Sequence, residues 1–176
     1  MEAKGEIISF PDDARDAAGA TLDFRVFFED EHRRLFKTLY FVTGDRAEAA
    51  DLMQDAFLKL WERWDRIPEI EDPVAYLFRI ALNGSRMRAR AVRRAALRPL
   101  PMVTLRDEFE GVDMREDVRR MLKDVAPRQR AALVLLDMYG YGSEEAARIM
   151  GVRPSTVRAL ATQGRAALRT KGGRDV

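Results

Sequence analysis

Hydrophobic residues recur along most of the chain with the period of an α-helix. In the segment that follows Leu22 they are spaced by three, four and seven positions, which gathers on one helical face Phe24, Phe27, Phe28, Leu35, Phe36 and Leu39. Gly44 follows this segment, and glycine readily adopts the left-handed conformation in which many helices end. The pattern predicts a first amphipathic helix that begins near Leu22 and ends at Gly44.

Asp45 and Glu48 have the spacing of a helix-capping pair, which predicts a second helix through about Trp64. Its buried stripe would contain Ala49, Met53, Ala56, Phe57, Leu60 and Trp64. The opposite face carries Leu58 among the acidic residues Asp51, Asp55 and Glu62. A leucine within an acidic face is expected where that face meets another protein, although a solvated face with one exposed leucine has the same pattern.

A loop of residues 67–73 separates this helix from a third, which Asp72 would cap and Pro73 would begin. The third helix should extend to about Arg94. Its inner side would contain Val74, Leu77, Phe78, Ala81 and Ser85. Its outer stripe combines an aromatic residue, an amide and arginines: Tyr76, Arg79, Asn83, Arg86, Arg90 and Arg94.

The charges of the chain are grouped in blocks, although its formal net charge is only +2. Six arginines and no acidic residue lie between Arg86 and Arg98. Residues 125–176 contain nine basic and four acidic residues. Stacking side chains next to backbone-binding cations are what single-stranded nucleic acid requires, so the outer stripe favours nucleic-acid binding. Arginines at a solvated helix end are the alternative.

The second half of the chain predicts another helical unit. Pro99 to about Gly111 has weak periodicity and indicates a linker. One helical face then carries Val118, Met121, Leu122 and Val125, and Pro127 would begin a further helix that ends near Gly140.

Residues 143–162 have the pattern of a helix-turn-helix. Ser143 is a suitable N-cap, Ala147 is small where two helices must approach closely, Gly151 would make the turn and Pro154 would start the second helix. The inner face of that helix would contain Val157, Leu160, Ala161, Gly164 and Leu168. Polar residues on its other sides could read base edges in the major groove. A helical hairpin without a ligand remains the alternative.

Composition excludes several kinds of site. The chain has no cysteine and a single histidine, His32, which excludes disulfides, thiolate metal sites and multi-histidine sites. We expect no cofactor, no metal and no small-molecule substrate, and we interpret His32 as an ordinary helix residue. The longest apolar run, Ala131 to Leu136, is far shorter than the about 20 residues of a membrane span. With no signal-peptide pattern at its start, we expect a cytoplasmic protein without membrane insertion.

Four segments together resemble bacterial RNA polymerase sigma factors of the extracytoplasmic-function (ECF) group, most like those of high-GC actinobacteria. They are Asp45–Trp61 (DRAEAADLMQDAFLKLW), Ala75–Asn83 (AYLFRIALN), Ala126–Leu135 (APRQRAALVL) and Ser155–Arg158 (STVR). The resemblance implies an all-α protein of two small helical domains joined by a flexible linker. The expected divisions are a flexible acidic tail (1–20), a first sigma domain (21–98), a linker (99–113) and a helix-turn-helix sigma domain (114–176).

The resemblance also implies partners and the residues that contact them. Core RNA polymerase would bind Asp51, Gln54, Asp55, Leu58, Trp61 and Glu62. The −10 promoter element would bind Ile67, Glu69, Asp72, Tyr76, Arg79, Asn83, Arg86 and Arg90. The −35 element would bind Arg153, Ser155, Thr156, Arg158, Thr162, Gln163 and Arg165. An anti-sigma factor is a further expected partner.

The chain departs from many such proteins at three positions, where it has Leu82, Leu160 and Gln163 instead of basic residues. The −35 contacts at Leu160 and Gln163 therefore do not transfer directly. Two other functions compete with the resemblance. A stand-alone helix-turn-helix regulator would bind DNA as a dimer, without polymerase. A magnesium-dependent nuclease could use Asp51 and Asp55, which lie one helical turn apart.

Overall fold

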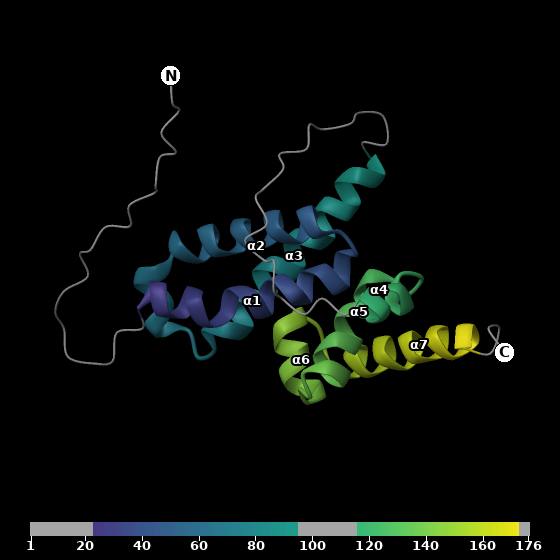
Figure 1. Ribbon diagram of the computed structural model, residues 1–176. Coiled ribbons are helices and arrows are strands. Elements are labelled where there is room, and N and C mark those ends of the chain that lie inside the picture. Colours follow the sequence, from purple (N-terminus) through teal and green to yellow (C-terminus); the bar gives the residue numbers. More distant parts are fainter. Residues whose placement is uncertain (1–22, 95–115, 173–176) are drawn as a thin grey trace, which may run out of the picture.

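The computed structural model describes residues 23–94 and 116–172, and within these ranges all regular secondary structure is helical, as the sequence predicts (Figure 1). The first module (residues 23–94) contains α1 (Phe24–Thr43), α2 (Arg46–Trp61), the 3₁₀ helix η1 (Trp64–Glu69) and α3 (Pro73–Arg94). The second module (residues 116–172) contains α4 (Glu116–Leu122), α5 (Pro127–Leu133), the π-helix η2 (Val134–Met138), α6 (Ser143–Met150) and α7 (Pro154–Gly172). The predicted tail (1–20) and linker (99–113) lie outside the described residues.

Aspartate side chains begin the helices of the first module. The carboxylate of Asp45 accepts a hydrogen bond from the backbone N–H of Glu48 at 2.8 Å, and Asp72 accepts one from the N–H of Ala75 at 2.8 Å. Each bond satisfies a backbone donor that the first helical turn leaves without a partner. Gly44 ends α1 in the left-handed conformation, with φ 79°. The predicted starts of α2 and α3 and the end of α1 are confirmed.

The chain between α2 and α3 differs from the prediction. α2 ends at Trp61 instead of near Trp64, and the segment that was expected to begin a loop forms η1. The cause is Ile67, whose side chain is only 1% exposed. A 3₁₀ helix has a tighter turn than an α-helix, so it carries Ile67 into the core over a short stretch of chain.

Apolar faces of α1, α2 and α3 meet in one core. Its largest fully buried side chains include Leu35, Phe36, Leu39, Phe41, Leu60, Leu77 and Phe78. Burial of each such side chain contributes about 1.5–3 kcal/mol, so this core supplies most of the stability of the first module. At one end the ring of Phe24 packs edge-on against Trp61 and Trp64, with centroid distances of 4.7 Å and 5.0 Å.

The second module contains the predicted helix-turn-helix. Gly151 joins α6 and α7 in the left-handed conformation with φ 62°, and Pro154 begins α7. Two details of the prediction are wrong. Gly142, not Ser143, occupies the N-cap position, and Ser143 is the first helical residue. Met121 is 57% exposed instead of buried, because α4 spans only seven residues and packs through Leu122.

The two modules also pack against each other, which the sequence pattern does not predict. α5 of the second module lies against α1, and α6 lies against α3 (Figure 1). The described part of the chain therefore forms one packed body in which the helix-turn-helix adjoins the third helix of the first module.

We predict that Gly164→Ala destabilises the protein. Within a helix this change normally stabilises by about 1 kcal/mol. Here the added methyl carbon would lie 2.9 Å from Leu133 Cδ1, so the overpacking should instead cost about 1–3 kcal/mol. Urea unfolding followed by circular dichroism measures the difference. Thr162→Ala, at an exposed position of the same helix, is the control and should change stability by less than about 0.5 kcal/mol. Equal or greater stability of Gly164→Ala would show that α5 and α7 are less tightly packed.

Candidate partner-binding and nucleic-acid interfaces

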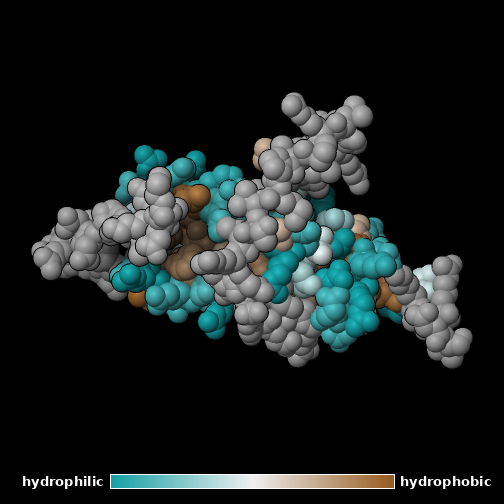
Figure 2. Space-filling view, turned by 45° about the horizontal axis from the view of Figure 1, so that its top comes forward, coloured by the Kyte–Doolittle hydropathy of each residue, from teal (hydrophilic) through white to brown (hydrophobic). Residues whose placement is uncertain are grey.

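The outer face of α2 presents hydrophobic side chains among polar ones. Leu58 is 60% exposed, and Trp61, one helical turn further on, is 38% exposed. Figure 2 shows brown hydrophobic atoms between teal ones on the half of the molecule that contains α1–α3. A leucine and a tryptophan exposed together favour a protein-binding surface. The other residues predicted for this surface are exposed or half-buried: Asp51, Gln54, Asp55 and Glu62.

Trp61 is held in place from the side. The ring of Phe24 on α1 packs against it at an interplanar angle of 65°. Because a neighbouring ring fixes its orientation, a partner would immobilise little of its side-chain freedom on binding. The exposed edge of Trp61 is therefore a preformed part of the α2 surface.

α3 displays the predicted mixed stripe on its outer side. Arg79 and Asn83 are exposed, while Tyr76 is half-buried and its hydroxyl accepts a hydrogen bond from Arg63 at 3.1 Å. Arg86 donates to the side-chain oxygen of Asn83, also at 3.1 Å. The structure thus brings an aromatic ring, an amide and two guanidinium groups to one helix face. Arg90 follows on the same helix, and its side chain lies outside the described residues.

Three residues that precede α3 were predicted to contact the −10 element, and the structure gives each of them a different environment. The predicted contact of Ile67 with DNA is wrong, because its buried side chain belongs to the core. Glu69 is exposed at the end of η1. The carboxylate of Asp72 caps α3 through the N–H of Ala75, so its position is fixed by the helix start. Glu69 alone of the three extends an unconstrained polar group to the surface.

α7 presents the predicted reading face of the helix-turn-helix. Val157 and Ala161 are fully buried against the rest of the module, and Leu160 is half-buried against the same core, as its spacing predicts. With these residues inside, the polar positions face outward. Those predicted for DNA contact are exposed (Arg153, Ser155, Arg158, Thr162, Gln163 and Arg165) or half-buried (Thr156).

Three of these polar side chains already have partners within the second module. Arg158 donates to the Ser143 hydroxyl at 3.2 Å, and Gln163 accepts from the Gln129 amide at 3.2 Å. Arg165 donates twice to the Asp137 carboxylate, at 3.1 Å and 2.5 Å, and this interaction raises the pKa of Arg165. Asp137 lies 28 residues earlier in the chain, beyond the reach of any local spacing pattern.

Within the described ranges, no group of three or more histidine, aspartate or glutamate residues is arranged to hold a metal ion. His32 stacks on Phe28 with a centroid distance of 4.9 Å, and its Nδ1 lies 2.8 Å from the Phe28 carbonyl oxygen. None of the helices in the same ranges has the length and apolar character needed to cross a bilayer.

A helix-turn-helix joined to a helix with an arginine and aromatic face is typical of a DNA-binding transcription factor. Comparisons with known proteins identify the family within this class. Residues 27–95 match the family described as Sigma-70 region 2, and residues 115–168 match Sigma-70, region 4. The ECF RNA polymerase sigma factor SigM of Mycobacterium tuberculosis is 30% identical over 156 residues, covering 88% of this chain and 80% of SigM. The RNA polymerase sigma-E factor of Streptomyces avermitilis is 29% identical over 155 residues, covering 87% of each chain.

Solved structures show the same fold. The sigma factor RpoE, in complex with the anti-sigma factor NepR from Bartonella quintana, superposes with a TM-score of 0.64 at 24% identity, over 84% of this chain and 95% of RpoE. The ECF sigma factor SigJ of M. tuberculosis superposes with a TM-score of 0.54 at 26% identity, over 82% of this chain and 53% of SigJ. The chain therefore belongs to the ECF group of the sigma-70 family of transcription initiation factors. It is an alternative sigma factor that directs transcription, and the comparisons do not support a stand-alone regulator.

We predict that Asp137→Asn increases the salt dependence of double-stranded DNA binding. The change releases Arg165 from its ion pair, so that its guanidinium can bind one more phosphate. Each added phosphate contact steepens the slope of log K against log salt concentration by about 0.9. Fluorescence anisotropy at salt concentrations from roughly 50 to 300 mM measures this slope. In an Arg165→Ala background, Asp137→Asn should leave this slope unchanged. An equally steeper slope in that background would show that the loss of the Asp137 carboxylate, and not the release of Arg165, causes the effect.

Proposed function

We propose that α2 is the docking surface for core RNA polymerase. The observation that supports this proposal is that Leu58 and Trp61 are both exposed. Acidic and amide side chains surround them, and the other side of the same helix is buried. By resemblance, the partner is the pair of clamp helices of the largest polymerase subunit. A protruding leucine fits an apolar pocket on such a partner, while Asp51, Asp55 and Glu62 would attract basic residues around it.

Leu58→Asp should weaken binding to core polymerase at least about tenfold, because it places a charge at the centre of an apolar contact. The fold should be retained, since Leu58 is 60% exposed and makes no part of the core. Biolayer interferometry with immobilised core polymerase measures the affinity, and circular dichroism checks the fold. Met121→Asp is the matched control: Met121 is 57% exposed on the second module and should leave the affinity unchanged. Unchanged binding of a folded Leu58→Asp would remove the docking role from α2.

The proposed contact with the −10 element is the α3 stripe of Tyr76, Arg79, Asn83, Arg86 and Arg90, with Glu69 beside it. Separation of the promoter strands needs a site that compensates for unstacking and unpairing a base, which costs a few kcal/mol. An aromatic ring, an amide and cations on one helix face supply stacking, base-edge and phosphate contacts together. Asp72 would act by positioning α3, and Ile67 is not included.

The proposed contact with the −35 element is the outward face of α7. Ser155, Arg158, Thr162 and Gln163 are exposed near the start and middle of the helix, which is the part that a helix-turn-helix inserts into the major groove. Arg153 and Arg165 lie beside them and would bind phosphates, with Thr156 at the edge. The two sigma domains would span residues 21–98 and 114–176, with residues 99–113 as the linker.

Arg158→Ala should lower transcription from promoters that the wild-type protein activates. If Arg158 reads a base, the loss should be roughly tenfold and largest on promoters with the preferred base, corresponding to about 1–3 kcal/mol. Run-off transcription with a set of −35 variants measures this. Arg128→Ala, an exposed arginine on α5 with the same change in charge, is the control and should have little effect. An equal loss on every −35 sequence would assign Arg158 to phosphate binding.

An anti-sigma protein is the further partner that we propose. Its support is that RpoE was solved with the anti-sigma factor NepR, and that CnrH was solved with the cytosolic domain of CnrY. We place this protein in the cytoplasm, where polymerase and chromosome are found. No cofactor or substrate enters the proposed activity.

A further inference from the structure

The side-chain amide of Gln163 is held by a second glutamine on a neighbouring helix. Gln163 is exposed on α7, and its Oε1 accepts a hydrogen bond from Nε2 of Gln129 on α5 at 3.2 Å. The two residues are 34 positions apart, so their contact depends on the packing of α5 against α7. Within residues 23–94 and 116–172, the amide nitrogen of Gln163 has no hydrogen-bond partner. This nitrogen is therefore available to a partner outside the protein.

The start of α5 determines the direction of this hydrogen bond. A primary amide accepts through its oxygen and donates through its nitrogen, and the neighbouring groups decide which end faces which partner. The backbone N–H of Ala126 can only donate, and its nitrogen lies 3.4 Å from Oε1 of Gln129. This capping contact directs the Gln129 oxygen toward the helix start and leaves its nitrogen to donate to Gln163. Gln163 must then turn its own oxygen toward α5.

Close packing keeps Gln129 in this position. Gly164, the residue after Gln163, is buried on α7, and Gln129 is half-buried. A methyl carbon added at Gly164 would lie 3.3 Å from Cβ of Gln129, a tighter contact than most Cβ atoms make. The glycine thus lets Gln129 approach the backbone of α7. Ala126, Gln129 and Gln163 form a chain of hydrogen bonds, the amide relay, that is supported by the packing of the second module.

The amide relay limits which base Gln163 can recognise in a major groove. A glutamine reads adenine through two hydrogen bonds, donating to N7 and accepting from the N6 amino group. The second of these needs the glutamine oxygen, which in Gln163 faces Gln129. The group that remains is a hydrogen-bond donor. Guanine presents two acceptors, N7 and O6, whereas cytosine presents only a donor. Guanine therefore matches this side chain best and cytosine least.

We propose that Gln129 determines a base preference at the −35 element: it holds the amide of Gln163 with the nitrogen toward the DNA, so that Gln163 selects guanine over adenine. This inference rests on the −35 contact proposed above for α7, whereas the amide relay does not. Gln129 is a positioning residue, because it contacts Gln163 and acts on the base only through it.

The base preference is measured by run-off transcription with the full chain and core polymerase. The template is a promoter that the wild-type protein activates, with each −35 position changed in turn to all four bases. Gln163→Ala identifies the position that Gln163 reads, because the preference there should fall to less than about twofold. At that position the wild-type protein should transcribe the guanine promoter at least about fivefold more than the adenine promoter.

Two substitutions of Gln129 test the direction of the relay. Gln129→Glu introduces a carboxylate that only accepts, both from the Ala126 N–H and from the Gln163 nitrogen. The Gln163 amide should then reverse, so that the preferred base becomes adenine or cytosine, whose amino groups donate. Gln129→Leu removes both polar atoms of the side chain. A released Gln163 can read adenine as well, so the ratio of guanine to adenine should fall to less than about twofold.

Arg128→Ala is the control for charge in this experiment. Arg128 is the exposed neighbour of Gln129, and its loss changes the net charge by the same amount as Gln129→Glu. It should leave the order of the four bases unchanged. Circular dichroism checks the fold of each variant, and an acidic residue in the first turn of α5 is favourable for a helix. A wild-type preference for adenine, no −35 position affected by Gln163→Ala, or an unchanged order of bases in folded Gln129→Glu would each overturn the proposal.

A second measurement tests the amide relay in the free protein. Nuclear magnetic resonance follows the exchange of side-chain amide hydrogens with water. In the wild type the hydrogens of Gln129 should exchange more slowly than those of Gln163, because Gln129 is the donor. In Gln129→Glu the hydrogens of Gln163 should become the slower ones, and unchanged exchange at Gln163 would overturn the relay. Absence of both polymerase binding and transcription would contradict the proposed function instead, while the exchange rates would still decide the relay.

Discussion

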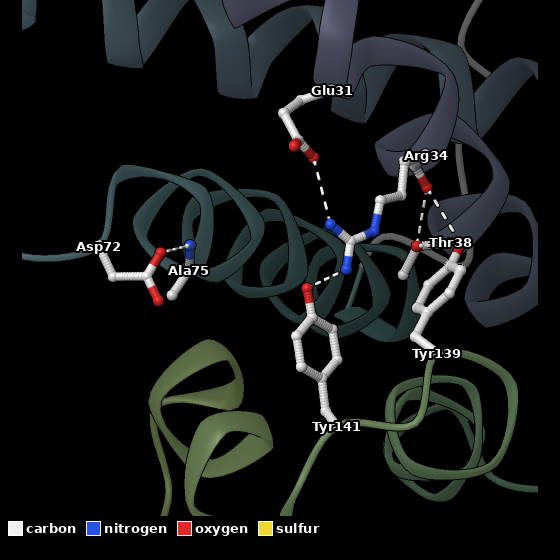
Figure 3. Close-up of polar contacts among 7 residues, drawn as sticks. All are labelled: Glu31, Arg34, Thr38, Asp72, Ala75, Tyr139 and Tyr141. Atoms are coloured by element: carbon white, nitrogen blue, oxygen red, sulfur yellow. Dashed lines mark hydrogen bonds and ion pairs between the residues drawn. The ribbon is translucent and has the colours of Figure 1, made fainter.

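A half-buried arginine surrounded by aromatic rings lies at the contact between the two modules (Figure 3). Arg34 is a charge removed from much of its water, and the faces of Phe78, Tyr139 and Tyr141 and the carboxylate of Glu31 compensate for this. A single cation–π contact is worth about 0.5–1 kcal/mol when exposed and about 2 kcal/mol when desolvated. Burial raises the pKa of Glu31 while Arg34 acts in the opposite direction, so the two groups depend on each other. This cluster supports the contact between the modules, beside the packing of α5 on α1 and of α6 on α3.

The surfaces themselves follow from the period of the helix. In each of α2, α3 and α7 one side is apolar and buried, so the residues on the other side are displayed in a fixed row. Phe57 and Leu60 are buried while Leu58, between them, is 60% exposed. Val157 and Ala161 are fully buried, which directs Arg158 and Thr162 outward. The packing that stabilises the fold therefore also determines which side chains meet polymerase and DNA.

Local signals account for what could be predicted from the sequence. Capping aspartates, Gly44 and Gly151 mark helix ends through interactions within a few residues, and their predicted positions are confirmed at Asp45, Asp72 and both glycines. The burial of Ile67 was not predicted, because a tight 3₁₀ turn has no strong sequence pattern of its own. The exposure of Met121 was not predicted either, because periodicity alone does not show how short α4 is.

Contacts between distant parts of the chain could not be predicted in this way. Arg34 and Tyr141 are 107 residues apart, and Arg165 and Asp137 are 28 residues apart. No spacing rule links such residues, since their meeting depends on how whole helices pack. The same holds for Arg79, whose Nε would lie 3.0 Å from a methyl carbon added at Gly151 in the turn between α6 and α7. The sequence thus indicates which surfaces exist, and the fold determines which of them are covered.

The most direct test of a sigma-factor function is in vitro transcription with core polymerase on a fragmented genomic library from the source bacterium, followed by sequencing of transcript starts. Reactions with the protein should yield starts that are absent without it and that share two sequence motifs at a constant spacing upstream. A protein that binds polymerase by size-exclusion chromatography and gives such starts acts as a sigma factor. Absence of new starts together with absence of polymerase binding would contradict this function.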